Sequence, residues 1–191
     1  AATYDDAAVL ARETGARMAG RLDLVKIDPV RIADIGCASG DGIRELQRRY
    51  PAALPVAVDF SVEMLRLART RTPALQRLVR RAPRLVKADV RALPLAANSL
   101  DLIWSNLMLH WLDDPLPALR ELQRTLNVGG LLMFAMLGPD TLKELRAACQ
   151  ECGVKPPLRQ FHDMHDIGDM LLAAGFADPV MDMEIISLTY S

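Results

Sequence analysis

The stretch of sequence that decides the fold runs from Val30 to Gly42 and reads VRIADIGCASGDG. A short apolar run that contains Ile32 and Ile35 leads into three glycines, and a helical pattern begins directly afterwards. This order predicts a strand, a tight loop and a helix. Glycine lets backbone N–H groups approach a ligand closely, and the first turn of a helix offers N–H donors and a positive dipole end. The loop is therefore predicted to accept the negative group of a small ligand.

The length and composition indicate one folded domain. The chain has 191 residues, of which 51% are hydrophobic, and its formal net charge is -1. This length allows a sizeable core, and the apolar content argues against disorder. No apolar run reaches the roughly 18 residues that span a bilayer and no leader-like segment opens the chain, so we expect a soluble, cytoplasmic protein. The near-neutral charge predicts no nucleic-acid partner, and the arginines between Arg66 and Arg84 are expected to form a solvated helix face.

Predicted strands and helices alternate along the chain. Apolar runs predict buried strands at residues 30–35, 56–58, 84–88, 100–104 and 131–136. Helical spacing predicts helices at residues 1–24, 43–50, 62–68, 116–126, 141–149 and 166–174, and a last strand is expected over 180–190. The alternation predicts an α/β fold, with a doubly wound, mostly parallel sheet that carries helices on both faces.

Carboxylates follow three of the predicted strands. Asp34, Asp59 and Asp89 stand at the carboxyl ends of successive strands, where ligands bind in sheets of this kind. Asp59 lies nineteen residues after Gly40, a spacing typical of an acidic residue that accepts hydrogen bonds from both hydroxyls of a ribose. Any one aspartate is equally compatible with a simple turn at a strand end. Together with the glycine loop, the three predict a nucleoside ligand that carries both a negative and a positive group.

The loop also limits which nucleoside can bind. It matches neither the G-x-G-x-x-G pattern of dinucleotide sites nor the G-x-x-x-x-G-K-[ST] pattern of triphosphate sites. Several acidic side chains around the pocket would repel phosphates, whereas they suit a nucleoside that bears a sulfonium and an α-amino group. We therefore expect a nucleoside without phosphates.

These motifs resemble those of class I S-adenosylmethionine-dependent methyltransferases over about residues 30 to 136. The resemblance is carried by the segments DIGCASG (34–40), VDFSVEM (58–64) and ADV (88–90), and by Phe134 after a Val-Gly-Gly turn. Ala38 departs from the family pattern, because a glycine is usual at this position. The resemblance implies a Rossmann-like methyltransferase fold and S-adenosyl-L-methionine as the cofactor.

The resemblance also implies which residues bind the cofactor. They are Asp34, Gly36, Gly40, Asp59, Phe60, Met64, Asp89, Val90 and Asn106. Gly36 and Gly40 would flank the methionine portion, Asp59 would hold the ribose hydroxyls, and Asn106 would lie near the sulfonium. Met64 would pack on the adenine, Val90 would line the adenine slot, and the Asp89 carboxylate would accept a hydrogen bond from the amino group.

Two further segments resemble a narrower family. SNLMLHWLDDP (105–115) and MLGPDTLKELR (136–146) are similar to the malonyl-acyl-carrier-protein O-methyltransferases of biotin synthesis, and also to a related mitochondrial assembly factor that hydroxylates an arginine. Tyr4-Asp5-Asp6 fits the N-terminal lid of the same group. The resemblance implies an acyl-carrier-protein thioester as the methyl acceptor. Another acceptor, hydroxylation of an arginine and a non-catalytic binding role stay open as alternatives.

The expected domain divides into three parts. Residues 1–28 form the N-terminal helical lid, residues 29–136 form the cofactor-binding core, and residues 137–191 supply helices on the substrate side and a C-terminal strand. Members of the narrower family usually continue with a further helical stretch and a last antiparallel strand. We therefore expect this chain to be truncated.

The chemistry implied by a carboxylate acceptor is simple. The acceptor is already ionised at neutral pH, so catalysis would depend on positioning and desolvation and needs no general base. His110 is the candidate catalytic residue, in a positioning role, and the competing interpretation is packing within the lid. The sequence singles out no arginine to bind the acceptor. Cys149-x-x-Cys152 and His162-x-x-His165 have a zinc-like spacing without a finger-like hydrophobic pattern, so no metal is expected.

Overall fold

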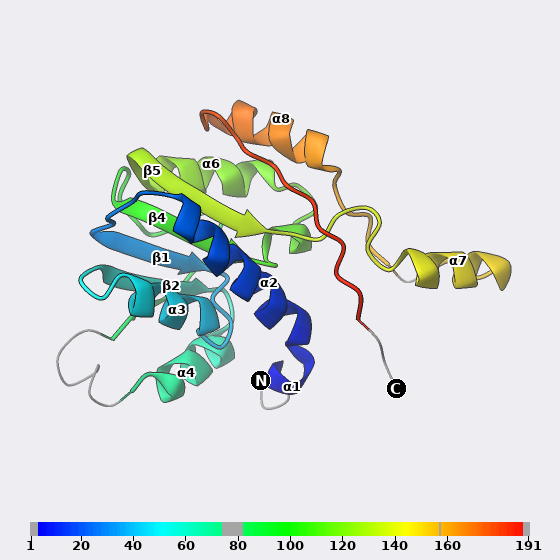
Figure 1. Cartoon of the computed structure of the whole chain (residues 1–191), viewed down its shortest axis with the longest axis horizontal. Helices are drawn as coiled ribbons and strands as arrows, with labels where there is room; N and C mark the ends of the chain where they lie inside the picture. The colour runs from blue at the N-terminus through cyan, green and yellow to red at the C-terminus, as the bar shows by residue number, and fades with distance from the viewer. Residues whose placement is uncertain (1–3, 74–81, 157, 189–191) are drawn as a thin grey trace.

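The structure, a computed structural model, describes residues 4–73, 82–156 and 158–188. Within these residues a parallel sheet has the strand order β3-β2-β1-β4-β5 (Figure 1). The strands are β1 (Arg31–Ile35), β2 (Leu54–Asp59), β3 (Arg84–Lys87), β4 (Leu100–Asn106) and β5 (Leu126–Ala135). The order reverses between β1 and β4, as in a doubly wound sheet. The predicted α/β fold is therefore confirmed.

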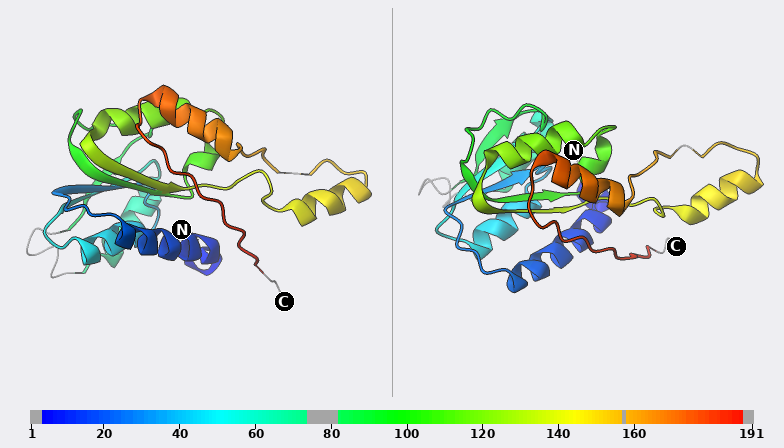
Figure 2. Two further views of the ribbon diagram at one scale, coloured as in Figure 1. Left: turned by 45° about the horizontal axis from the view of Figure 1, so that its top comes forward. Right: turned by 90° about the horizontal axis from the view of Figure 1, so that it is seen from above.

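Helices cover both faces of this sheet (Figure 2). They are α1 (Tyr4–Ala7), α2 (Val9–Arg21), α3 (Asp41–Arg49), α4 (Val62–Arg71), α6 (Leu116–Thr125), α7 (Lys143–Glu151) and α8 (Met164–Ala174), with the short 3-10 helices η1 (Leu22–Leu24) and η2 (Leu109–Trp111). Helices α2, α3 and α4 pack on one face around Trp104, whereas α6 and α8 pack on the other around Leu119. Helix α7 projects from the body and has no buried residue.

Burial on both faces explains why the central strand has no alternating polar pattern. In β1, Ile32 packs in the core under α2 and α3, while Ala33 and Ile35 pack in the core under α6. Successive side chains of a strand point to opposite faces, so Asp34 shares the face of Ile32 and points toward α3. The acidic residue at the end of this strand is thus placed beneath a helix.

Asp101 joins the starts of three segments. Its Oδ2 atom accepts hydrogen bonds from the N–H groups of Val30 (2.9 Å) and Arg31 (2.8 Å), and its Oδ1 atom accepts one from the Asn127 side chain (2.5 Å). The register between β4 and β5 is irregular here, because Leu126 and Leu131 pair with positions only two residues apart in β4. Residues 127–130 therefore interrupt the regular pairing of β5 with β4.

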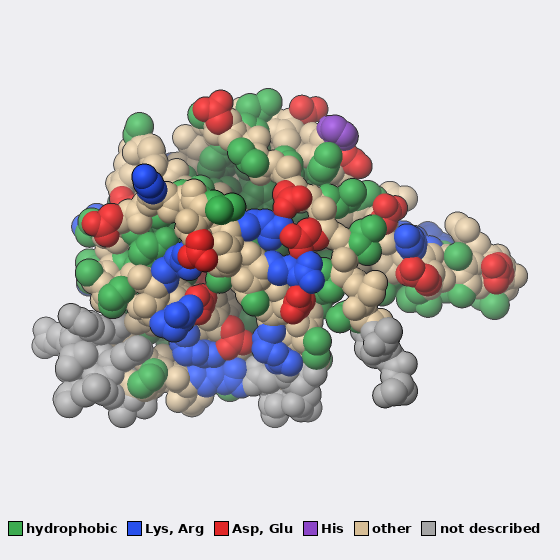
Figure 3. Space-filling view, viewed as in Figure 1, with side chains coloured by type: hydrophobic (Ala, Val, Ile, Leu, Met, Phe, Trp, Pro, Cys, Tyr) green, Lys and Arg blue, Asp and Glu red, His purple; other side chains and the backbone are tan. Residues whose placement is uncertain are grey.

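The strand expected over 180–190 is wrong for residues 180–188, which form no strand. Residues 189 and 190 lie outside the described residues, as do residues 74–81 of the arginine-rich stretch. The C-terminal segment lies against α2, where Arg17 contacts Glu184 (2.5 Å) and Arg21 contacts Asp182 (2.5 Å), and charged side chains of both signs mix on this face (Figure 3). A strand needs a neighbouring backbone for its hydrogen bonds, and a helix cannot supply one. In the described residues no helix is long and apolar enough to cross a membrane.

Replacing Asp101 tests whether its hydrogen bonds stabilise the sheet. Asp101→Ala leaves two backbone N–H groups and an amide without their acceptor, so we expect the free energy of unfolding to fall by about 2 kcal/mol. Urea denaturation measures this change. The control is Asp169→Ala on the exposed side of α8, which should change stability by less than about 0.5 kcal/mol. Equal effects of the two substitutions would contradict the assignment.

Candidate functional site

The predicted site residues lie in a row along one edge of the sheet. Because all the paired strands are parallel, their carboxyl ends meet at the same edge. The strand order places Asp89, Asp59, Gly36 and Asn106 next to one another in that sequence. The sequence-based expectation that the strand ends converge is therefore confirmed.

The glycine loop is tied to β2 by its own backbone. The N–H groups of Gly36 and Cys37 donate to the Val58 carbonyl (2.8 and 3.0 Å), and the Ala38 N–H donates to the Asp59 carboxylate (2.8 Å). These donors were expected to face a ligand. They bind the neighbouring strand instead, so an anion would have to use other donors of the loop or of the first turn of α3.

Two of the loop glycines are required by close packing. Gly36 has a φ of 79°, and a Cβ atom there would lie 2.5 Å from Cγ of Met108. At Gly42 a Cβ atom would lie 2.6 Å from Oδ2 of Asp34 and 2.8 Å from Nε1 of Trp104. No side chain fits at either position without displacing its neighbours. Met108, which sequence reasoning missed, therefore covers the glycine loop.

Asp34 is buried beneath the first turn of α3. Only 2% of the residue is exposed, and its carboxylate accepts a hydrogen bond from the Ile43 N–H. Burial raises the pKa of Asp34 to about 7, and the nearby charges of Asp59 and Asp41 act in the same direction. The structure thus gives Asp34 a packing role at α3, and its predicted contact with a cofactor stays a prediction.

The hydrogen bonds of Asp59 are compatible with its predicted role in binding a ribose. Its Oδ2 atom accepts from the Ala38 N–H and its Oδ1 atom accepts from the Ser61 N–H, both at 2.8 Å. An ionised carboxylate oxygen can accept about two hydrogen bonds, so each oxygen keeps one position for a further donor. Two adjacent hydroxyl groups could fill these positions. Ser61 also caps α4 by accepting from the Met64 N–H (3.4 Å).

The cofactor-binding residues expected near the ends of β2 and β3 differ in exposure. Phe60 is 78% exposed beside Asp59, Met64 is partly buried in the first turn of α4, and Val90 is 8% exposed within the core under α6. The Asp89 carboxylate is exposed and bound by Arg91, a contact that sequence reasoning missed. The structure brings these residues to the same end of β2 and β3, and their roles in binding stay predictions.

Asn106 connects the sheet to the N-terminal helix. Its Oδ1 atom accepts from the Thr14 hydroxyl (2.8 Å) and its Nδ2 atom donates to the Ala11 carbonyl (2.7 Å). Thr14 was not identified as a site residue from the sequence. Thr14 lies between Leu10 and Met18 on the inward face of α2, where a polar side chain needs a hydrogen-bond partner. The residue expected near the sulfonium is therefore held by α2.

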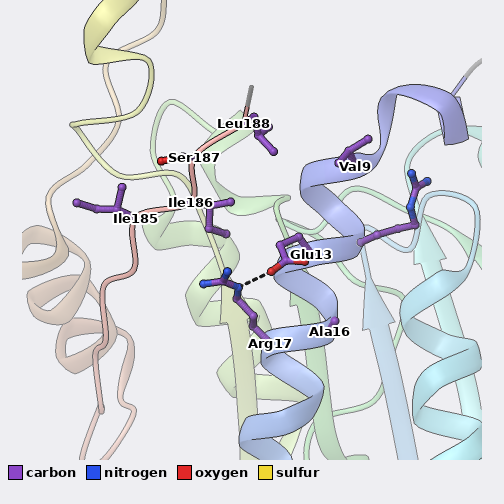
Figure 4. Close-up of a pocket in the computed structure, with 9 residues that line it drawn as sticks. Val9, Glu13, Ala16, Arg17, Ile185, Ile186, Ser187 and Leu188 are labelled. Carbon is purple, nitrogen blue, oxygen red and sulfur yellow. Dashed lines mark hydrogen bonds and ion pairs between the residues drawn. The ribbon is translucent and has the colours of Figure 1, made fainter. Parts of the chain in front are cut away.

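Two further features flank α2. Tyr4 is half-buried, and burial together with the charges of Asp41 and Asp59 raises its pKa, so α1 brings this ring close to the glycine loop. On the other flank, a pocket of about 560 Å³ separates α2 from the C-terminal segment (Figure 4). Val9 and Ala16 of α2 form one wall of this pocket, and residues 185–188 form the other.

His110 is buried at the end of β4, where η2 begins the connection to α6. Its ring packs 5.4 Å from that of Trp111 and 5.8 Å from that of Phe161, and its Nδ1 atom has no hydrogen-bond partner among the described residues. Burial, assisted by the charge of Arg159, lowers the pKa of His110 to about 4. His110 is therefore neutral at physiological pH.

Two arginines connect the segment after β5 to η2, and the charge of Arg159 acts on His110. Arg159 donates to the Trp111 carbonyl (2.8 Å) and forms an ion pair with Asp113. Arg146 of α7 donates to the Arg159 carbonyl (3.0 Å). These contacts link the 137–163 segment to η2 and bring positive charge to the side of the site opposite Asp89.

The cysteines do not form a reactive centre with the histidines. Cys37 is buried, and burial raises the pKa of its thiol, so it is a neutral packing residue. Cys149 lies in α7 and Cys152 at its end, whereas His162 precedes α8 and His165 lies in its first turn. In the part of the chain that the structure describes, no group of three or more potential ligands could hold a metal ion.

Ala38, where the family usually has glycine, is expected to lower the stability of the protein. Ala38 has a φ of 44°, a left-handed conformation that only glycine adopts without strain. We expect Ala38→Gly to raise the free energy of unfolding by about 1 kcal/mol. Ala173→Gly in the last turn of α8 is the control and should lower it by about 0.5 kcal/mol. Denaturation of both variants measures the difference, and a destabilised Ala38→Gly protein would contradict the strain.

The burial of His110 predicts how stability depends on pH. Its pKa is lower in the folded protein than in the unfolded chain, so between pH 6.5 and pH 4 only the unfolded chain takes up the proton. As the pH falls through this range, the free energy of unfolding of the wild type should therefore drop by up to about 3 kcal/mol relative to that of His110→Gln. Denaturation at several pH values measures the difference, in which the contributions of the other histidines cancel. A constant difference would contradict the lowered pKa.

Known proteins that resemble this chain agree with its fold and motifs. Malonyl-[acyl-carrier protein] O-methyltransferases from Gallionella capsiferriformans and Laribacter hongkongensis are 50% and 53% identical to it, and the alignments cover 98% and 100% of this chain. The chain spans 65% of the length of both relatives.

A solved SAM-dependent methyltransferase from Thermotoga maritima has the same fold, with a TM-score of 0.66 and 22% identity over 92% of this chain and 76% of that one. One from Mesorhizobium loti has a TM-score of 0.63 and 23% identity over 83% and 80% of the two chains. The model of the methyltransferase domain family matches residues 33–134, which include β2, β3, β4 and most of β1 and β5. The family predicted from the sequence is confirmed, and the chain belongs to the methyltransferase domain family.

Proposed function

We propose that this chain is the cofactor-binding part of an S-adenosyl-L-methionine-dependent O-methyltransferase that acts on malonyl-acyl carrier protein in biotin synthesis. The observation that carries the proposal is the identity of 50% and 53% to two enzymes of that name over essentially the whole chain. The same relatives favour methylation over arginine hydroxylation and over a non-catalytic role.

The residues at the strand ends fit the proposed cofactor. The two acceptor positions left on Asp59 suit the ribose hydroxyls, and Asp89 suits the amino group of adenine. When bound, S-adenosyl-L-methionine supplies a methyl group activated by a positively charged sulfonium. The carboxylate side chains at this edge favour such a cation and disfavour phosphates.

The contacts around His110 support a carboxylate acceptor. A malonyl carboxylate is ionised at neutral pH, so no group has to remove a proton from it. The neutral His110 would help to position the acceptor and exclude water. Arg159 and Arg146 provide the positive charge that an anionic acceptor requires, and the buried Nε atom of Arg146 has no hydrogen-bond partner among the described residues.

The proposal also includes the division of the chain and the location of the enzyme. Residues 1–28 would form a lid over the core at 29–136, and residues 137–191 would face the acceptor. The hydrogen bonds of Asn106 to α2 and the position of Tyr4 beside the glycine loop support the lid. An enzyme of biotin synthesis that uses a carrier protein would act in the cytoplasm.

The test is a methylation assay with the chain, S-adenosyl-L-methionine and malonyl-acyl carrier protein. Mass spectrometry should detect the methyl ester on the carrier protein, and acetyl-acyl carrier protein, which lacks the free carboxylate, should stay unchanged. Asp59→Ala should lower the rate at least about tenfold, because two hydrogen bonds to the cofactor are lost. Asp169→Ala serves as the control and should retain the wild-type rate.

Two results would contradict different parts of the proposal. Binding of S-adenosylhomocysteine without any methyl ester would show that malonyl-acyl carrier protein is not the acceptor of this chain. Absence of binding, measured by calorimetry, would reject the cofactor itself.

A further inference from the structure

Arg91 binds the carboxylate of Asp89, the residue expected to recognise adenine. Its Nε atom lies 3.0 Å from Oδ1 and 3.2 Å from Oδ2 of Asp89, and its Nη2 atom lies 2.6 Å from Oδ2. The backbone N–H of Arg91 also donates to Oδ1 (2.9 Å). Val90, between the two residues, is 8% exposed and packs in the core, so the backbone that carries both side chains is anchored.

The number of hydrogen bonds leaves one acceptor position on this carboxylate. A carboxylate accepts about four hydrogen bonds, two on each oxygen. Oδ1 of Asp89 receives the backbone N–H and the Nε–H of Arg91, and both of its positions are filled. Oδ2 receives mainly the Nη2–H, so it keeps one position for a ligand. The fork of a guanidinium also fixes the rotation of the carboxylate and therefore the direction of that position.

The pair remains accessible to a ligand. The Arg91 and Asp89 side chains are 58% and 48% exposed. The hydrogen bonds from the Arg91 side chain lower the pKa of Asp89 to about 2, so the carboxylate stays ionised and can only accept. A ligand group that meets Oδ2 must therefore be a donor, and an oxygen at the same place would be repelled.

We propose that Arg91 is a positioning residue for base recognition, which holds the Asp89 carboxylate so that Oδ2 accepts one hydrogen bond from the 6-amino group of adenine and excludes a 6-oxo base. This inference rests on the proposed S-adenosyl-L-methionine site and deepens it. Arg91 acts through Asp89 and does not itself contact the base. It determines the choice between an amino and an oxo group.

Calorimetry with two ligands tests this role without any turnover. The ligands are S-adenosylhomocysteine and its 6-oxo analogue, S-inosylhomocysteine, and the proteins are the wild type, Arg91→Ala and Arg91→Lys. Arg91→Ala should weaken binding of the amino ligand about fivefold and change binding of the oxo ligand less than about twofold, because a carboxylate free to rotate loses its fixed direction. Lysine keeps the charge but not the fork, so Arg91→Lys should fall between the two proteins.

The control is Arg120→Ala, which removes an exposed arginine of α6 and should bind both ligands like the wild type. The Arg91 pair is exposed, so its loss should leave the melting temperature nearly unchanged. Unaltered selectivity in both Arg91 variants, or an equal loss of affinity for both ligands, would overturn the positioning role while leaving the cofactor assignment intact. Failure of the wild type to bind S-adenosylhomocysteine would overturn both.

Discussion

The arrangement of the site depends on the two hydrogen bonds that the Asp59 carboxylate accepts. One comes from Ala38 in the glycine loop and the other from Ser61 before α4, each at 2.8 Å. The two segments follow different strands, so one side chain at the end of β2 fixes the loop relative to the helix. A carboxylate can do this and still bind a ligand, because only half of its acceptor positions are used. The group that holds the site together is thus the same group that we propose to recognise the nucleoside.

The sequence predicts the core of this fold well because the central strands are covered on both faces. Such strands are short, nearly continuous apolar runs, and all five expected runs overlap strands of the sheet. The expected strand at 180–190 also contains several apolar residues, but Asp182 and Glu184 interrupt them, and its described part lies against α2. The composition of a segment indicates only that it can form a strand. A strand also requires a neighbouring strand for its hydrogen bonds, and the sequence of the segment does not reveal whether one is present.

The same distinction explains which parts of the site were predictable. The carboxylates could be located because strand ends are marked by the change from apolar to polar residues, and the fold brings these ends together. Their partners could not be located in the same way. The contact of Thr14 with Asn106 joins residues 92 positions apart, and the contact of Arg91 with Asp89 depends on the rotamer of a flexible side chain. Sequence spacing predicts position, and only packing determines which groups bind each other.

The side of the site proposed to bind the acceptor has a chemical character opposite to that of the side proposed to bind the cofactor. Carboxylates line the ends of β2 and β3, where a sulfonium cofactor would be attracted, whereas the segment after β5 brings Arg159 close to His110. Burial keeps His110 uncharged, so its imidazole cannot serve as the cation, and its low pKa makes it a weak base. For an acceptor that must lose a proton, His110 would therefore be a poor general base. A carboxylate needs no deprotonation and is attracted by arginine, so these residues suit a carboxylate better than an acceptor that carries a proton.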